Sequence, residues 1–306
     1  MSPLREALRD YLQIRRSLGF KLDAAGRLLE DFVGFLEQAG ATRITTELAR
    51  SWARLPRDAQ PLWWRRRLGM VRGFARYLVT IDPQSEVPSR DLLPSHQRRV
   101  PPYIYSEAEI AALMDAARAL TPPLAAATCQ TVIGLMAATG LRLGEALGLD
   151  RQDVDLTDGV LHVRVSQSNP REVPLHESTI AALRSYARVR DRHWPTANTA
   201  AFFVSRRGLR LPRRTFHGNF QRLIRQVGLE GRGHRARPRP HDLRHAYAVR
   251  TLLDFHAAGL EVDRELLLLS TILGHDDPTS TFWYLEAVPE LMSIVAQRLN
   301  GLVGQS

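Results

Sequence analysis

A stretch rich in proline and serine divides this chain near one third of its length. Five prolines fall within residues 83–102, and the stretch shows little hydrophobic periodicity, which is typical of a linker. The length of 306 residues is enough for two domains, each with its own core. We therefore predict an N-terminal domain over residues 1–85, a linker over 86–102, a second domain over 103–297 and a tail over 298–306.

The N-terminal domain shows the spacing of amphipathic helices. Apolar residues recur every three or four positions and predict four helices, over residues 4–18, 24–39, 45–52 and 63–79. Thr45 or Thr46 is the expected cap of the third helix. The fourth helix is basic, with Arg65, Arg66, Arg67, Arg72 and Arg76. A small basic bundle of this kind suits a clamp around DNA.

The second domain is expected to be mixed. Ser106 and Glu109 form a capping box before a helix, and another helix over 125–138 ends at Gly140. Two alternating runs, 160–165 and 172–175, flank a Ser-Asn-Pro turn and predict a β-hairpin. After Ser178 the pattern is mostly helical. The predicted fold class is mainly α, with a helical N-terminal domain and a mixed α+β second domain that holds a small antiparallel sheet.

Positive charge is concentrated in two parts of the chain. The formal net charge is +10, and 41 of the 42 basic residues are arginine, with Lys21 as the only lysine. Residues 1–100 carry a net +7, and residues 205–250 carry a net +11 from 13 arginines and two acids. Two basic regions favour a polyanionic partner, and a guanidinium binds two phosphate oxygens at once. A solvated basic surface is the alternative.

Several classes of protein are excluded or disfavoured. The single cysteine, Cys129, allows no intrachain disulfide and no cysteine metal cluster. The apolar run over 124–141 is broken by polar residues and predicts a buried helix, because a membrane span needs about 20 mainly apolar residues. The charged, amphipathic N-terminus resembles no secretory signal. We expect a cytoplasmic protein without membrane segments, cofactors or bound metal.

Four segments carry side chains of the kinds that are found in active sites. Arg142 follows Gly140 at a helix start, and His241 and Arg244 share one helix face because they lie three positions apart. His275 lies between a helix-ending Gly274 and Pro278, and Tyr284 follows it by nine positions. Taken singly, each has a structural explanation: a surface arginine, capping histidines or a core tyrosine. His241 and His245 have zinc-protease spacing, but Asp242 stands where that motif needs glutamate.

The four segments together are far more specific. Their order, read from ATGLRLGEAL, PHDLRHAYA and LGHDDPTSTFWYL, resembles the tyrosine recombinase (phage integrase) family over about residues 101–297. The resemblance implies an enzyme that breaks and rejoins double-stranded DNA at specific sites, for integration or transposition of a mobile element. It also implies a homo-oligomer, a tetramer on synapsed DNA.

The resemblance also implies a role for each residue. Arg142 and Arg244 would clamp the scissile phosphate, and His241 would act beside it as an acid–base group. His275 would donate a hydrogen bond to a non-bridging oxygen. Tyr284 would attack phosphorus, giving a 3′-phosphotyrosyl link and a free 5′-hydroxyl, with no need for ATP or metal. Glu145, one turn after Arg142, would orient it.

The sequence departs from the family in the hairpin. The family has a lysine there that protonates the leaving 5′-oxygen, and Ser166 or Gln167 stands at that position here. Arg164 or Arg171 could reach the leaving oxygen instead, but an arginine holds its proton too tightly to be a good general acid. Since general acid catalysis is typically worth about 10²–10⁴-fold, we expect slower cleavage.

Three alternatives remain at this stage. A DNA-binding relative that has lost catalysis is supported by the missing lysine, and a DNA-relaxing topoisomerase would use similar chemistry. A zinc hydrolase is more distant. The helical pattern over 286–304 predicts either a helix packed on its own domain or a tail that docks on a neighbouring protomer.

Overall fold

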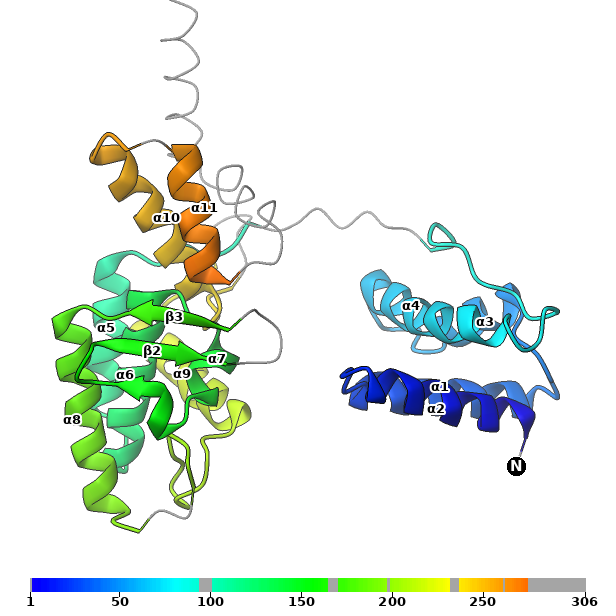
Figure 1. Ribbon diagram of the computed structural model, residues 1–306, viewed down its shortest axis with the longest axis horizontal. Coiled ribbons are helices and arrows are strands. Elements are labelled where there is room, and N and C mark those ends of the chain that lie inside the picture. Colours follow the sequence, from blue (N-terminus) through cyan, green and yellow to red (C-terminus); the bar gives the residue numbers. More distant parts are fainter. Residues whose placement is uncertain are drawn as a thin grey trace, which may run out of the picture. The chain divides into compact units, whose positions relative to one another are not determined.

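The computed structural model describes residues 2–93, 101–164, 170–196, 199–231, 237–260 and 262–274, with no side-chain description for 262–264 (Figure 1). The chain forms two compact units, Met1–Arg99 and Val100–Ser306. Ser166, Gln167, His275, Tyr284 and the predicted helix over 286–304 lie outside the described residues. The mainly helical fold with one small antiparallel sheet is confirmed.

The first unit is a bundle of four helices, α1 (Pro3–Ser17), α2 (Asp23–Gln38), α3 (Thr46–Ala53) and α4 (Pro61–Leu78). All four predicted helices are present, with ends that differ by at most two residues. Thr45 is the cap of α3, because its hydroxyl accepts a hydrogen bond from the Leu48 amide at 3.2 Å. Phe32, Trp52 and Phe74 are fully buried in the bundle core.

The first unit extends further along the chain than the expected boundary at residue 85. The guanidinium of Arg72 donates to the carbonyls of Pro88 and Ser89, each at 2.7 Å, and Leu93 is buried in the bundle core. The first half of the expected linker therefore packs on α4. The prolines rule out a helix there, but their carbonyls still accept hydrogen bonds from a neighbouring side chain.

The described part of the second unit holds a sheet and seven α-helices. The helices are α5 (Glu107–Arg118), α6 (Pro123–Thr139), α7 (Leu143–Gly148), α8 (Glu177–His193), α9 (Arg213–Val227), α10 (Asp242–Ala257) and α11 (Val262–Leu273). The predicted capping box starts α5, with both the Ser106 and the Glu109 hydrogen bonds present. As expected from the apolar run, α6 is largely buried and packs against α5, α8 and α10.

The sheet has three antiparallel strands in the order β1 (Val154–Asp155), β2 (Val160–Val163) and β3 (Arg171–Pro174). The predicted hairpin corresponds to β2 and β3, and β1 was not expected. Leu161, Val163 and Val173 alternate with more exposed residues and enter the helical core, so one face of the sheet is covered. Arg171, the first residue of β3, lies next to α11 and donates a hydrogen bond to it.

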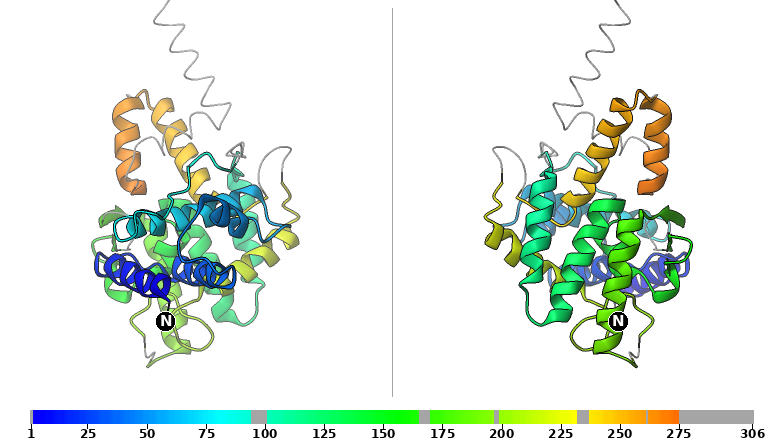
Figure 2. Two further views of the ribbon diagram at one scale, coloured as in Figure 1. Left: turned by 90° about the vertical axis from the view of Figure 1, so that its right-hand side faces the viewer. Right: turned by 90° about the vertical axis from the view of Figure 1, so that its left-hand side faces the viewer.

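The helices α10 and α11 lie side by side at one end of the second unit, in the orange part of the ribbon (Figure 1, Figure 2). Leu252 of α10 packs with Leu266, Leu269 and Leu273 of α11 in a separate small cluster. Within the described residues, no helix is long and apolar enough to cross a membrane.

Candidate active site

The first component of the site is the turn between α6 and α7. Gly140 ends α6 with a φ of +65°, a conformation that glycine adopts without steric cost. A Cβ atom on Gly140 would clash with the Tyr247 ring and lie 2.8 Å from Cδ2 of Leu273. The turn therefore approaches α10 and α11 closely, and Arg142 follows directly at the start of α7.

Arg142 is held by a carboxylate and a backbone carbonyl. Its Nη1 donates to Oε1 of Glu145 at 2.9 Å, and its Nη2 donates to the Gly274 carbonyl at 3.0 Å. The backbone amide of Arg142 also donates to Oε2 of Glu145, at 2.9 Å. The side chain keeps 28% of its surface exposed, so it can still bind an incoming anion. The expected orienting contact from Glu145 is thus present.

Arg244 donates to two backbone carbonyls. Its Nη1 donates to the Gly140 carbonyl at 2.9 Å, and its Nη2 donates to the Leu273 carbonyl at 2.7 Å. Leu273 and Gly274 are consecutive, so the two guanidinium groups of Arg142 and Arg244 bind neighbouring carbonyls. The three helices α6, α10 and α11 therefore bring these two arginines together.

His241 lies at the start of α10 beside both arginines. Its ring packs edge-on against His245, with 4.8 Å between ring centroids. Part of the residue is exposed, but desolvation by the surrounding protein and the nearby guanidinium groups, Arg244 most strongly, lower the pKa of His241 to about 4. The imidazole is therefore neutral at pH 7.

An ion pair with a buried carboxylate supports this helix start. Asp242 is fully buried and accepts hydrogen bonds from the backbone amide of Arg239 at 2.8 Å and from its Nη2 at 2.9 Å. The carbonyl of Arg239 in turn accepts a hydrogen bond from the Tyr105 hydroxyl at 3.2 Å. These contacts fix the turn that carries His241. The Arg239 guanidinium also contributes to the lowered pKa of His241.

The sequence pattern of the Phage integrase family matches residues 104–290, which includes Arg142, His241 and Arg244. The chain belongs to this family. As an enzyme, it is a tyrosine-type site-specific recombinase.

Relatives of the recombinase match it over nearly its whole length. The Sinorhizobium fredii protein y4rB, provisionally named an integrase/recombinase, is 42% identical and covers 98% of each chain. The tyrosine recombinase XerD of Pseudomonas putida is 32% identical and covers 92% of each chain.

Solved structures agree on the fold. The Tn1549 transposon integrase in complex with transposon right end DNA has a TM-score of 0.66 at 18% identity, covering 96% of this chain and 99% of the other. The lambda integrase dimer bound to a COC′ core site has a TM-score of 0.61 at 18% identity, covering 92% and 76%.

Of the site residues expected in this integrase, the structure brings together Arg142, His241, Arg244 and the orienting Glu145. His275 and Tyr284 fall outside the described residues, as do Ser166 and Gln167 in the hairpin. Among the residues that the structure describes, no group of three or more His, Cys, Asp or Glu could hold a metal ion.

Neither arginine considered as a substitute for the hairpin lysine points freely into the site. Arg164 pairs with Asp153 at 3.0 Å, and Arg171 is buried against Glu145, with 7% of its side chain exposed. The Arg171 contact is the main feature that sequence reasoning missed. The predicted run begins at residue 172, one residue after Arg171, and its pattern gives no sign that Arg171 would be buried.

Glu145 accepts hydrogen bonds from both Arg142 and Arg171. Its burial alone would raise the pKa of this carboxyl, but hydrogen bonds from Arg171 and Arg142 outweigh that effect and lower the pKa of Glu145 to about 2. Arg142 and Arg171 both donate to this carboxylate, and Arg244 lies close by on the Leu273 carbonyl, next to the Gly274 carbonyl that Arg142 binds. The three guanidinium groups and one carboxylate together carry net positive charge, which suits a phosphate that gains negative charge during reaction.

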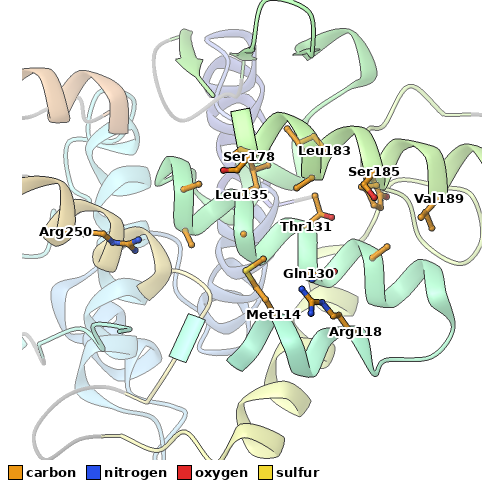
Figure 3. Close-up of a pocket in the computed structure, with 17 residues that line it drawn as sticks. Met114, Arg118, Gln130, Thr131, Leu135, Ser178, Leu183, Ser185, Val189 and Arg250 are labelled. Atoms are coloured by element: carbon orange, nitrogen blue, oxygen red, sulfur yellow. The ribbon is translucent and has the colours of Figure 1, made fainter. Parts of the chain in front are cut away.

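A separate pocket of about 540 Å³ lies between α5, α6 and α8, with Arg250 of α10 at one side (Figure 3). Met114, Leu135, Leu183 and Val189 make its lining mostly apolar. Arg142, Arg244 and His241 are not among the residues that line it.

The lowered pKa of His241 predicts a pH effect on stability. Between its ordinary value of 6.5 and about 4, the unfolded chain binds a proton that the folded chain does not. His241 therefore reduces the free energy of unfolding as the pH falls through this range. The substitution His241→Gln is expected to make that fall shallower, as measured by urea unfolding at several pH values. Parallel curves for the two proteins would contradict this effect.

Proposed function

We propose that this recombinase cuts and rejoins DNA through a 3′-phosphotyrosyl intermediate formed by Tyr284. The observation that carries the proposal is the pair of guanidinium groups, Arg142 and Arg244, fixed on consecutive carbonyls beside a neutral His241. Donors that are already in place before reaction stabilise developing charge without a cost of rearrangement.

In the proposed reaction, the two arginines bind the non-bridging oxygens of the scissile phosphate, and His275 donates to one of them. His241 takes the proton of the Tyr284 hydroxyl as its oxygen bonds to phosphorus. The bond from phosphorus to the 5′-oxygen breaks, and that oxygen takes up a proton. The phosphoester energy is retained in the tyrosyl link, so a second 5′-hydroxyl can reverse the step.

The missing hairpin lysine affects only the proton that the leaving oxygen receives. Since Lys21 is the only lysine, no lysine of the second unit can fill that role. We therefore expect strand cleavage slower by roughly the value of one general acid, about 10²–10⁴-fold.

We infer that both units contact double-stranded DNA. In the first unit, Arg50, Arg54 and Arg57 line a hollow of about 460 Å³ together with Trp64. Three guanidinium groups in one hollow suit the phosphate backbone of a duplex. The similarity to a transposon integrase structure and to the y4rB protein supports a role in moving a mobile element, which we place in the cytoplasm.

Covalent trapping tests the proposed chemistry. A duplex from the ends of the mobile element, nicked next to the cleavage site, loses its short 5′-hydroxyl fragment after cleavage and leaves the protein on the DNA. We expect an adduct with the natural chain and none with the matched variant Tyr284→Phe. An adduct that survives this substitution would overturn the proposal.

The same assay separates the alternatives. Sequence-specific binding without any adduct would identify a DNA-binding relative that has lost catalysis. Relaxation of supercoiled DNA that carries no specific site would instead identify a topoisomerase.

We propose further that the recombinase acts as a homo-oligomer, a tetramer on two DNA sites, with the segment over 286–304 docked on a neighbouring protomer. The apolar spacing of this segment supports the proposal. Removal of residues 290–306 is expected to abolish pairing of two sites and to leave binding to one site intact, as measured by gel mobility. Unchanged tetramer formation on DNA would contradict docking in trans.

A further inference from the structure

Three successive carbonyls at the end of α11 each accept a hydrogen bond from a different arginine. Nε of Arg171 donates to Ile272 at 2.7 Å, Nη2 of Arg244 to Leu273 at 2.7 Å, and Nη2 of Arg142 to Gly274 at 3.0 Å. The last carbonyls of a helix have no partner within it and carry the negative end of its dipole. The end of α11 therefore offers acceptors that favour guanidinium groups.

Arg171 differs from Arg142 in its surroundings. Its side chain is 7% exposed, compared with 28% for Arg142. Its Nη1 and Nη2 donate to the two oxygens of Glu145, at 3.2 and 2.9 Å. Arg171 therefore links β3 to two helices, to α7 through Glu145 and to α11 through the Ile272 carbonyl.

The backbone at Gly274 is fitted to this arginine. Gly274 has a φ of +64°, and a Cβ atom there would lie 2.7 Å from Nη1 of Arg171. A side chain would displace either the guanidinium or the turn. Arg171 and the turn at the end of α11 therefore fix each other's positions. The same turn also binds Arg142 through the Gly274 carbonyl.

Glu145 would act differently without Arg171. More of its negative charge would then act on Arg142 and would neutralise more of the positive charge available to a phosphate. Arg171 supplies a second cation for the carboxylate, so Arg142 can bind Glu145 and still attract an anion.

We propose that Arg171 is a positioning residue of the recombination site, which fixes Glu145 and the end of α11 and thereby aligns Arg142 with Arg244. The proposal rests on the proposed function, because it assigns Arg171 to the same phosphate. Arg171 does not touch the reacting atoms and is not a catalytic residue.

The first test compares Arg171→Gln with Arg184→Gln. Arg184 of α8 also donates to a backbone carbonyl, that of Leu156 at 2.6 Å, but lies outside the site. We expect Arg171→Gln to slow single-turnover cleavage at saturating DNA by about 10²-fold, as for loss of one transition-state donor, with DNA affinity unchanged and the control at the natural rate. An unchanged rate for Arg171→Gln would overturn the proposal.

A substrate with a methylphosphonate at the scissile position distinguishes positioning from a general structural effect. This group lacks one negative charge, so its cleavage depends less on where Arg142 places its charge. The penalty of Arg171→Gln is expected to shrink on this substrate. An equal penalty on both substrates would overturn the proposal.

A double substitution guards against misfolding, because Arg171→Gln leaves the Glu145 carboxylate with fewer partners. The variant Glu145→Gln/Arg171→Gln removes the charge as well. If Arg171 acts through Glu145, the cleavage rate of the double variant is expected to equal that of the slower single variant. Two independent roles would instead multiply the two losses of rate. Independent losses would count against the proposal.

Hydrogen exchange gives a result that does not depend on activity. We expect amides at the end of α11 and in residues 140–148 to exchange faster in Arg171→Gln than in Arg184→Gln. If the natural chain forms no DNA adduct, the proposed chemistry fails while this comparison still decides the role of Arg171. Equal exchange in the two variants would overturn that role.

Discussion

The substitution Arg244→Lys is expected to slow formation of the covalent DNA adduct by about 10²–10³-fold, the cost of removing one preorganised donor at a developing charge. Lysine keeps the positive charge. It lacks the planar fork with which Arg244 binds the Gly140 and Leu273 carbonyls, at 2.9 and 2.7 Å, and in the proposed reaction also binds the scissile phosphate. One ammonium cannot satisfy both carbonyls in that geometry and also bind the substrate.

The matched control is Arg184→Lys, which changes the same side chain on α8, where Arg184 is exposed. Its cleavage rate is expected to equal that of the natural chain. Single-turnover adduct formation with a nicked duplex measures both variants. Equal rates for Arg244→Lys and Arg184→Lys would contradict the role of Arg244 in the clamp.

The second large effect is expected for Gly140→Ala. A left-handed residue other than glycine costs about 1–2 kcal/mol, and forcing extra atoms into a packed core typically costs about 1–3 kcal/mol. Gly140 meets both conditions, since its φ is +65° and a Cβ would clash with Tyr247 and Leu273. We therefore expect the free energy of unfolding to fall by about 2–5 kcal/mol in urea titrations.

Gly228→Ala separates the two contributions. Gly228 ends α9 with a φ of +71°, and nothing lies within 4 Å of a Cβ built on it. Its substitution is expected to cost only the backbone part, about 1–2 kcal/mol. Equal losses for the two variants would mean that the turn at Gly140 relaxes away from α10 and α11. In that case, Arg244 would also lose its carbonyl partner and cleavage would fall in parallel.

Local signals explain which parts of the fold could be predicted. The capping box of Ser106 and Glu109, the end of α6 at Gly140 and the hairpin all depend on residues close together in sequence. The strand β1 has only two residues, too few to show an alternating pattern. Its pairing with β2 depends on the fold around it.

Long-range contacts explain the rest. Arg171 and Glu145 lie 26 positions apart on different elements, and Arg171 binds Ile272 across 101 positions. No periodicity in the sequence reports such a pairing. The motif residues Arg142, His241 and Arg244 could be found because their segments resemble a known family. Of the support beneath them, only Glu145 could be predicted, because the rest is made of one buried arginine and of backbone oxygens.

Every residue type has a backbone carbonyl, so the acceptors at the end of α11 do not depend on which side chains the helix carries. The carbonyls of Ile272 and Leu273 would remain in place after any substitution that keeps α11 helical and its buried side packed. Residue types along this helix can therefore change between relatives without loss of the arginine contacts. Gly274 is different, because its own Cβ would enter the space of Arg171. Tolerance to substitution is thus expected to end abruptly at this single residue.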